Sequence, residues 1–269
     1  MATIIAIASH KGGVGKTTTA LNLGYGLTRL GAKVLLVDGD PQGGLANASN
    51  LKRRTQAGLV QLLTNDRRAN EMVTYTRDQR MAVIGAGVVT TDDVLQFEEL
   101  ALAGQLAISI RELAHDFDYV LIDAPAGIGG VVRGLLLACD SVIVTLNPRP
   151  LAVKSLPSFL KLIKSMADSD NPGLRLEGVL VTMMNAKSQV DASVFAQLQA
   201  QLPGAAMFAT HIPFNEAFEV ASLHATPVAL LPAAALAARP YLDLALELKA
   251  RELKAQAEES ADDSSLGLF

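Results

Sequence analysis

Cysteine and long apolar runs are both scarce in this sequence of 269 residues. The single cysteine, Cys139, excludes an intrachain disulfide, which suits a reducing compartment. The apolar residues that precede it predict a core position rather than a nucleophile. No apolar run reaches the roughly 18 residues that a membrane span needs, and no basic stretch precedes an apolar one as in a secretory leader. We therefore expect a cytoplasmic protein.

An excess of charge of one sign is also missing from most of the chain. The net charge is −4, and the segment from Glu252 onward, with five acids and one base, carries all of it. The neutral remainder gives no global attraction to nucleic acid, and the acidic end is repelled by anionic lipid. We expect no membrane attachment, one domain over residues 1–257, and a disordered acidic tail over residues 258–269.

Apolar runs alternate with helical patterns along the chain, which predicts an α/β fold: a mostly parallel, twisted sheet with helices on both faces. The expected strands are Ile4–Ser9, Lys33–Val37, Met81–Ile84, Tyr119–Ile122, Ser141–Leu146, Gly178–Met183 and Ala206–Thr210. The expected helices are Thr18–Leu30, Gly58–Thr64, Asp92–Ala114, Gly130–Ala138, Val153–Ala167, Asp191–Gln201 and Ala233–Ala257. Ligands of such sheets bind at the carboxyl ends of the strands.

A glycine-rich turn, His-Lys-Gly-Gly-Val-Gly-Lys-Thr-Thr, joins the first expected strand to the first expected helix at residues 10–18. This context is typical of a loop whose backbone N–H groups surround a polyphosphate at a helix N-terminus. Lys16 is expected to reach the outer phosphates and Thr17 to bind Mg²⁺. The loop departs from the usual pattern because His10 stands where a glycine is common and Lys11 adds a second lysine.

The string Lys11–Thr18 resembles the deviant Walker A motif of the ParA/MinD family, P-loop ATPases of the SIMIBI type. Residues 37–44, Val-Asp-Gly-Asp-Pro-Gln-Gly-Gly, resemble the switch I of that family, and residues 121–127, Leu-Ile-Asp-Ala-Pro-Ala-Gly, resemble its Walker B and switch II. The likeness covers about residues 2–250. Asp-Pro-Gln and Ile-Pro segments place it closer to ParA than to MinD, although Pro-Ala-Gly-Ile is more like MinD.

Three carboxylates are candidates for binding Mg²⁺ and for orienting the attacking water. Asp123, at the end of an apolar run, is expected to hold Mg²⁺ directly or through water, and the alternative is a helix N-cap. The resemblance implies that Asp40 orients the attacking water and contacts the Mg²⁺ shell, whereas Asp38 braces the loop or that shell. Turn residues before a proline are the alternative for both.

The resemblance also implies the remaining site. Lys11, Lys16 and Asp40 are the expected catalytic residues, with Lys11 crossing to the phosphates of a second subunit, so that ATP and Mg²⁺ favour a homodimer. Asn185 and Pro213 are candidates to line the adenine pocket, or are plain turn residues. The complete expected nucleotide-binding set is Lys11, Gly12, Gly13, Val14, Gly15, Lys16, Thr17, Thr18, Asn185 and Pro213.

Such a switch implies slow, partner-stimulated ATP hydrolysis that positions or partitions a cargo, through nonspecific DNA on the nucleoid or through an adaptor protein. Candidate DNA contacts are basic residues, which an ordinary solvated surface explains equally well: Lys154, Lys161, Lys164, Lys187, Arg149, Arg53-Arg54 and Arg67-Arg68. The alternative function is a nucleotide-switched regulator or scaffold of a division, flagellar or secretion component. A redox enzyme that shares this loop needs two cysteines per chain for its cluster, and the single Cys139 argues against it.

Overall fold

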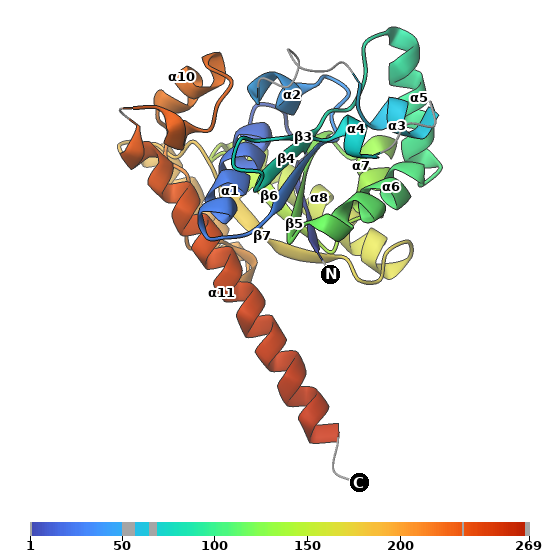
Figure 1. Cartoon of the computed structure of the whole chain (residues 1–269). Helices are drawn as coiled ribbons and strands as arrows, with labels where there is room; N and C mark the ends of the chain where they lie inside the picture. Colours follow the sequence, from blue (N-terminus) through green and yellow to red (C-terminus); the bar gives the residue numbers. More distant parts are fainter. Residues whose placement is uncertain (1, 50–56, 65–68, 233, 267–269) are drawn as a thin grey trace.

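The computed structural model describes residues 2–49, 57–64, 69–232 and 234–266. Within them lies one seven-stranded sheet, in the order β3-β4-β2-β5-β1-β6-β7 (Figure 1). Every pairing is parallel except that of β3 with β4. The strands are β1 (Thr3–Ser9), β2 (Val34–Asp38), β3 (Thr74–Tyr75), β4 (Met81–Ile84), β5 (Tyr119–Ala126), β6 (Ser141–Leu146) and β7 (Arg175–Val181).

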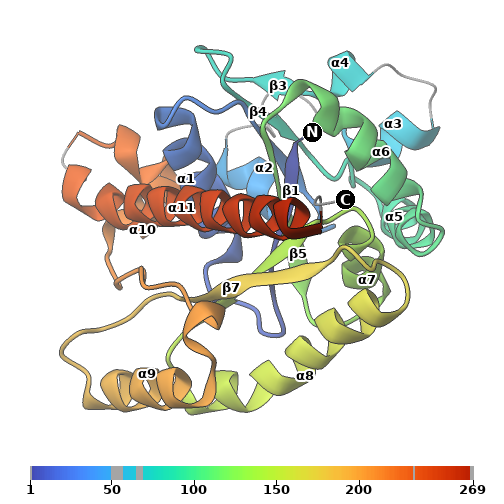
Figure 2. The ribbon, with the colours of Figure 1, turned by 90° about the horizontal axis from the view of Figure 1, so that it is seen from below.

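Helices cover both faces of this sheet, as the sequence predicts (Figure 2). The first six are α1 (Lys16–Arg29), α2 (Gly44–Ala48), α3 (Leu59–Thr64), α4 (Ala69–Met72), α5 (Thr91–Leu102) and α6 (Gln105–Leu113). The others are α7 (Gly130–Leu136), α8 (Pro150–Asp168), α9 (Gln189–Gln201), α10 (Ala217–Leu223) and α11 (Ala235–Leu266).

Alternating side chains of the strands supply two separate cores. In β1, Ile4, Ala6 and Ala8 face the core under α3 and α5–α9, whereas Ile5 and Ile7 face α1, α2 and α11. Successive residues of a strand point to opposite faces, so a strand that is buried on both sides needs apolar residues throughout. The continuous apolar runs of the sequence follow from this requirement.

Several details differ from the expectations, among them the short helices α2, α4 and α10, which were not expected. The strand expected over Ala206–Thr210 is absent as a strand: a 3-10 turn (η3, Gly204–Ala206) precedes one isolated parallel bridge between Val179 and Met207. The helix expected over Asp92–Ala114 is two helices, because Gly104 takes a left-handed conformation (φ 74°) that caps α6. The short antiparallel β3 was not expected, since two residues carry no periodic signal.

Helix α11 extends far beyond the sheet and ends on the side of the N-terminus (Figure 1). Its buried part includes Tyr241, Leu244 and Leu248, which pack on the core beside α1. Its far part continues to Leu266, into the segment 258–269 for which composition predicts disorder, so the structure differs there. An ion pair between Lys254 and Glu258 at i,i+4 supports helix in that solvated part. The domain boundary at residue 257 stays a prediction.

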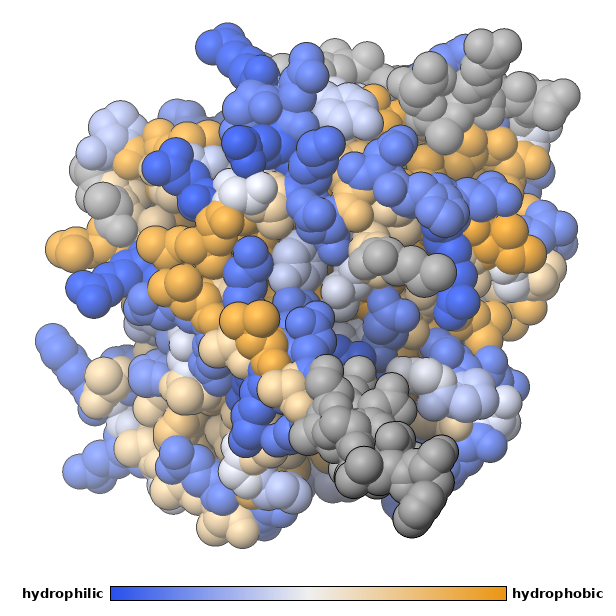
Figure 3. Space-filling model, turned by 60° about the horizontal axis from the view of Figure 1, so that its bottom comes forward, coloured by the Kyte–Doolittle hydropathy of each residue, from blue (hydrophilic) through white to orange (hydrophobic). Residues whose placement is uncertain are grey.

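The surface mixes hydrophilic and hydrophobic side chains on the face seen in Figure 3. Within the described part of the chain, no helix is both long and apolar enough to cross a bilayer. Cys139 is 1% exposed and belongs to the core under α3 and α5–α9, as the sequence predicts.

Candidate functional site: a nucleotide-binding loop at the carboxyl ends of the strands

The glycine-rich loop runs from the end of β1 to the start of α1. Gly13 and Gly15 have positive φ values of 68° and 77°, which glycine adopts without strain. No atom lies within 4 Å of a Cβ built on Gly12 or Gly13, so the outer side of the loop is open. Lys11 is exposed beside them, whereas the Lys16 side chain, at the first position of α1, is only 9% exposed.

The other end of the loop is tied to the segment that follows β7. The Thr182 hydroxyl donates a buried hydrogen bond of 2.9 Å to the backbone carbonyl of Val14, which is 1% exposed. Met183 has a positive φ of 55°, and its side-chain terminus lies 3.6 Å from a Cβ built on Gly15. The sequence pattern did not single out Thr182 or Met183, because the 168 residues between Val14 and Thr182 leave no local signal.

Thr17 and Asp123, the two side chains expected to bind Mg²⁺, are in contact, and their role as metal ligands stays a prediction. The Thr17 hydroxyl donates to Asp123 Oδ2 over 2.6 Å, and the other carboxylate oxygen, Oδ1, is buried without a hydrogen-bond partner. The pKa of Asp123 is raised to about 7, mainly by burial; the hydrogen bond from Thr17 and the charge of Lys16 oppose this rise, and the charge of Asp40 adds to it. A buried, unpartnered carboxylate oxygen requires a cation or a proton, which fits a Mg²⁺ ligand.

The position of Asp123 differs slightly from the expectation. Strand β5 does not end there but continues to Ala126, and Asp123 pairs in register with Asp38 on β2 and with Ile7 on β1. The pairing of β1 with β5 shifts between Ile7 and Ser9, where the chain leaves the sheet to form the loop. The two carboxylates therefore lie side by side on neighbouring strands.

Asp38 braces the segment after β2, as one of the two roles expected for it. Its Oδ2 accepts a 2.8 Å hydrogen bond from the backbone N–H of Ala46 in α2, and its side chain is fully buried. The pKa of Asp38 is raised to about 7, mainly by burial; the backbone hydrogen bonds oppose this rise, and the charges of Asp123 and Asp40 add to it. Gly44 of the same segment approaches Thr17, since a Cβ there would lie 3.3 Å from the Thr17 hydroxyl oxygen.

Asp40 begins a turn rather than continuing the extended strand. Its Oδ1 accepts from the backbone N–H of Gln42 over 2.9 Å, and its carbonyl accepts from Gly43. Its charge is near enough to raise the pKa of Asp123. The turn geometry and a catalytic role are compatible, so both roles assigned to Asp40 stay predictions.

The two candidates for the adenine pocket come together. Pro213 forms an isolated parallel bridge with Met184, the neighbour of Asn185. The Asn185 side chain accepts from the backbone N–H of Lys187, so it also serves as a turn residue. Its backbone N–H donates to Asp191, which is fully buried. Contact with a base stays a prediction for Asn185 and Pro213.

The candidate DNA contacts are dispersed over α8 and the loop after β7. Lys154, Lys161 and Lys187 are exposed, and Lys164 is held in an ion pair of 3.1 Å with Asp168. Arg149 pairs with Asp191 over 3.2 Å. The pairs Arg53-Arg54 and Arg67-Arg68 lie outside the described residues.

The donors fit a nucleotide with a metal ion rather than a metal ion alone. Within the described ranges, no three His, Cys, Asp or Glu side chains are grouped to hold a metal by themselves. One hydroxyl and one buried carboxylate suit Mg²⁺, which takes its remaining ligands from phosphate oxygens and water. The loop, the α1 N-terminus and Lys16 offer the matching phosphate site, so the fold and site define a P-loop nucleotide-binding protein.

Comparison with known proteins narrows this class. A family model described as an AAA domain matches residues 2–176. The chain is 30% identical over 252 residues to the sporulation initiation inhibitor protein Soj of Bacillus subtilis, covering 93% of this chain and 99% of that protein. It is 34% identical over 249 residues to the chromosome-partitioning ATPase Soj of Thermus thermophilus, covering 92% and 95%. The chain belongs to the ParA/MinD family of ATPases and is closer to ParA.

Solved structures agree with the fold. The cell division ATPase MinD of Pyrococcus furiosus superposes with a TM-score of 0.77 at 25% identity, over 93% of this chain and 99% of that one. A cobyrinic acid a,c-diamide synthase of Mycobacterium smegmatis, solved with an ATP analogue and magnesium, gives a TM-score of 0.74 at 27% identity, over 91% and 93%. ATP and Mg²⁺, the cofactors of the family, match the donors described above.

Proposed function

We propose that this protein is an ATPase switch that dimerises with ATP and positions or partitions a cargo. The observation that carries the proposal is the contact of Thr17 with the buried, partly unpartnered carboxylate of Asp123, next to a glycine-rich loop whose outer side is open. Thr17, Asp123 and Lys16 line the inner side of the loop, while Lys11 is exposed on an outer side with free space around Gly12 and Gly13. The exposed Lys11 and the open space beside Gly12 and Gly13 are what the approach of a second copy to the loop needs.

Hydrolysis in this scheme depends on positioning and charge neutralisation. Bound Mg²⁺ supplies Lewis-acid stabilisation of the phosphate charge. The loop N–H groups and Lys16 hold the phosphates, Thr17 and Asp123 hold the metal, and Asp40 orients water. Lys11 of the partner subunit adds positive charge next to the phosphates, as an arginine finger does. ATP turnover therefore depends on dimerisation.

Dimerisation is tested by light scattering after size exclusion, with ATP and Mg²⁺ and with Asp40→Ala to block turnover. We expect a dimer for Asp40→Ala, and monomers when Lys16→Ala or Lys11→Ala is added. The control is Lys33→Ala, which removes an exposed lysine at the amino end of β2, far from the loop. A protein that stays monomeric with ATP while Asp40→Ala binds nucleotide refutes the dimer switch.

The attachment of the dimer is tested with nonspecific DNA in a gel shift. Binding that requires ATP and weakens with Lys154→Ala and Lys161→Ala supports transport over the nucleoid, since phosphate contacts by lysine dominate nonspecific affinity. Both lysines are exposed, and neither forms an ion pair with a described residue, whereas Lys164 pairs with Asp168. An intact dimer that does not bind DNA supports the alternative, a switch that acts on a protein partner in the cytoplasm.

A further inference from the structure

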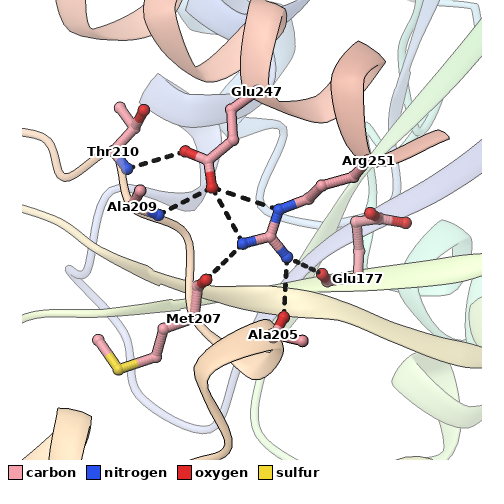
Figure 4. A network of polar contacts seen from close by, with 7 residues as sticks. All are labelled: Glu177, Ala205, Met207, Ala209, Thr210, Glu247 and Arg251. Carbon is pink, nitrogen blue, oxygen red and sulfur yellow. Dashed lines mark hydrogen bonds and ion pairs between the residues drawn. The ribbon is translucent and has the colours of Figure 1, made fainter. Parts of the chain in front are cut away.

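Two side chains of α11, Arg251 and Glu247, hold the backbone of the segment that leads to Pro213, and we call this pair the clip. Arg251 donates to the backbone carbonyls of Glu177, Ala205 and Met207, the first two over 2.9 and 3.0 Å (Figure 4). Glu247 accepts from the backbone N–H groups of Ala209 and Thr210, both over 2.8 Å.

The two clip residues are themselves joined. Arg251 donates to Glu247 Oε1 from Nε over 3.2 Å and from Nη2 over 2.9 Å, and the guanidinium lies 4.2 Å from the centre of the Phe208 ring. The Arg251 side chain is only 23% exposed and the Glu247 side chain only 18%. A planar guanidinium with all its donors directed is a rigid connection that lysine does not reproduce.

The clip is not needed to fix α11 to the body. Tyr241, Leu244 and Leu248 of the same helix are at most 2% exposed in the core with α1, and the Tyr241 hydroxyl lies 3.2 Å from that of Thr19 in α1. The partners of the clip are instead backbone groups of Glu177 in β7 and of residues 205–210, and the segment 205–210 pairs with β7 by only one isolated bridge. The clip replaces the sheet ladder that this segment lacks.

The clipped segment continues directly to the nucleotide site. Beyond Thr210, the backbone of Ile212 donates to Val181 over 2.9 Å and accepts from Met184 over 3.0 Å. Pro213 then bridges to Met184, two residues after Thr182, whose hydroxyl holds the phosphate loop. Pro213 is thus held from two sides: by the contacts of its neighbours with Val181 and Met184, and along the chain by residues 205–210, whose backbone the clip holds.

We propose that Arg251, assisted by Glu247, is a positioning residue for the base of the nucleotide. It acts through the backbone of residues 205–213 and touches neither the base nor the phosphates. The proposal rests on the function proposed above, in which Asn185 and Pro213 line the adenine pocket. It assigns to α11 an effect on the base half of the site, while the phosphate half depends on the loop and α1.

The test compares two probes, Mg²⁺–ATP and Mg²⁺–tripolyphosphate, by calorimetric titration of the full chain. Arg251→Met keeps the apolar stem and removes the donors. We expect its affinity for ATP to fall about tenfold, the size of one charged hydrogen bond lost, while the affinity for tripolyphosphate changes less than about twofold. Arg251→Lys restores charge without the planar fork, so we expect it to recover little of the loss.

The matched control is Arg80→Met, because the Arg80 guanidinium also donates to a backbone carbonyl, that of Gly31, over 2.9 Å but at the amino end of the sheet. We expect it to change neither affinity. Glu247→Gln, which keeps the shape of the side chain, provides a second variant should Arg251→Met fail to fold, and we expect the same selective loss of ATP affinity.

Equal losses for both probes, or an unchanged ATP affinity in a folded variant, overturn the positioning role. A wild-type protein that binds neither probe refutes the proposed function instead, so the two failures are distinguishable.

Discussion

The buried carboxylate of Asp123 should make the nucleotide-free protein less stable as pH rises. Its pKa is raised from 3.8 to about 7, mainly by burial. A raised pKa contributes stability that is fully present below pH 3.8 and is lost as pH rises through about 7. The complete loss is about 4 kcal/mol, and about 2 to 3 kcal/mol of it falls between pH 5 and pH 8.

Asp123→Asn isolates this effect, because the amide oxygen still accepts from Thr17 and does not ionise. The free energy of unfolding is measured by urea denaturation at pH 5 and pH 8, without nucleotide or phosphate and with a chelator. We expect the stability of Asp123→Asn relative to wild type to increase by about 2 to 3 kcal/mol from pH 5 to pH 8. Any constant cost of the amide cancels in this difference.

The control is Asp93→Asn. Backbone N–H groups of Val89 and Thr90 hold the pKa of Asp93 below its usual value, so the carboxylate is ionised in both states across this range. Its difference from wild type should be the same at pH 5 and pH 8. A difference for Asp123→Asn that stays flat or decreases would refute the assignment of a buried, uncompensated carboxylate.

Three further predictions concern a close helix contact, a buried hydrogen bond and the access of a reagent to Cys139. Gly134→Ala places a Cβ 2.2 Å from the Ala101 carbonyl oxygen, so we expect a loss of about 2 kcal/mol or more in urea denaturation. Thr182→Val removes the hydrogen bond to Val14, and we expect about 1 to 3 kcal/mol lower stability together with weaker tripolyphosphate binding. Cys139, buried and with a raised thiol pKa, should react with a thiol reagent only after unfolding; rapid native reaction would contradict the core position.

The sequence predicted the sheet and most of its helices because each element carries its own periodicity. The loop at residues 10–18 was equally readable, since its glycines and lysines are adjacent in the chain. The convergence of Thr17 and Asp123 followed from one topological rule, that parallel strands end at one edge. It is confirmed by their hydrogen bond of 2.6 Å.

What the sequence did not predict depends on contacts between distant segments. The segment 206–210 has the composition of a strand, but its backbone groups are held by Glu247 and Arg251 of α11 instead of by a full ladder. Thr182 reaches the phosphate loop across 168 residues. The break at Gly104 was missed because apolar periodicity continues on both sides of it.

The far end of α11 also determines what can be attached to this protein. Tyr119, at the start of β5, donates a hydrogen bond to Glu252 of α11, and the helix continues from residue 253 to residue 266. At 1.5 Å per residue this part extends about 20 Å. Because the far end of α11 points away from the carboxyl ends of the strands (Figure 1), a fluorescent protein inserted after residue 266 would start well away from the nucleotide loop.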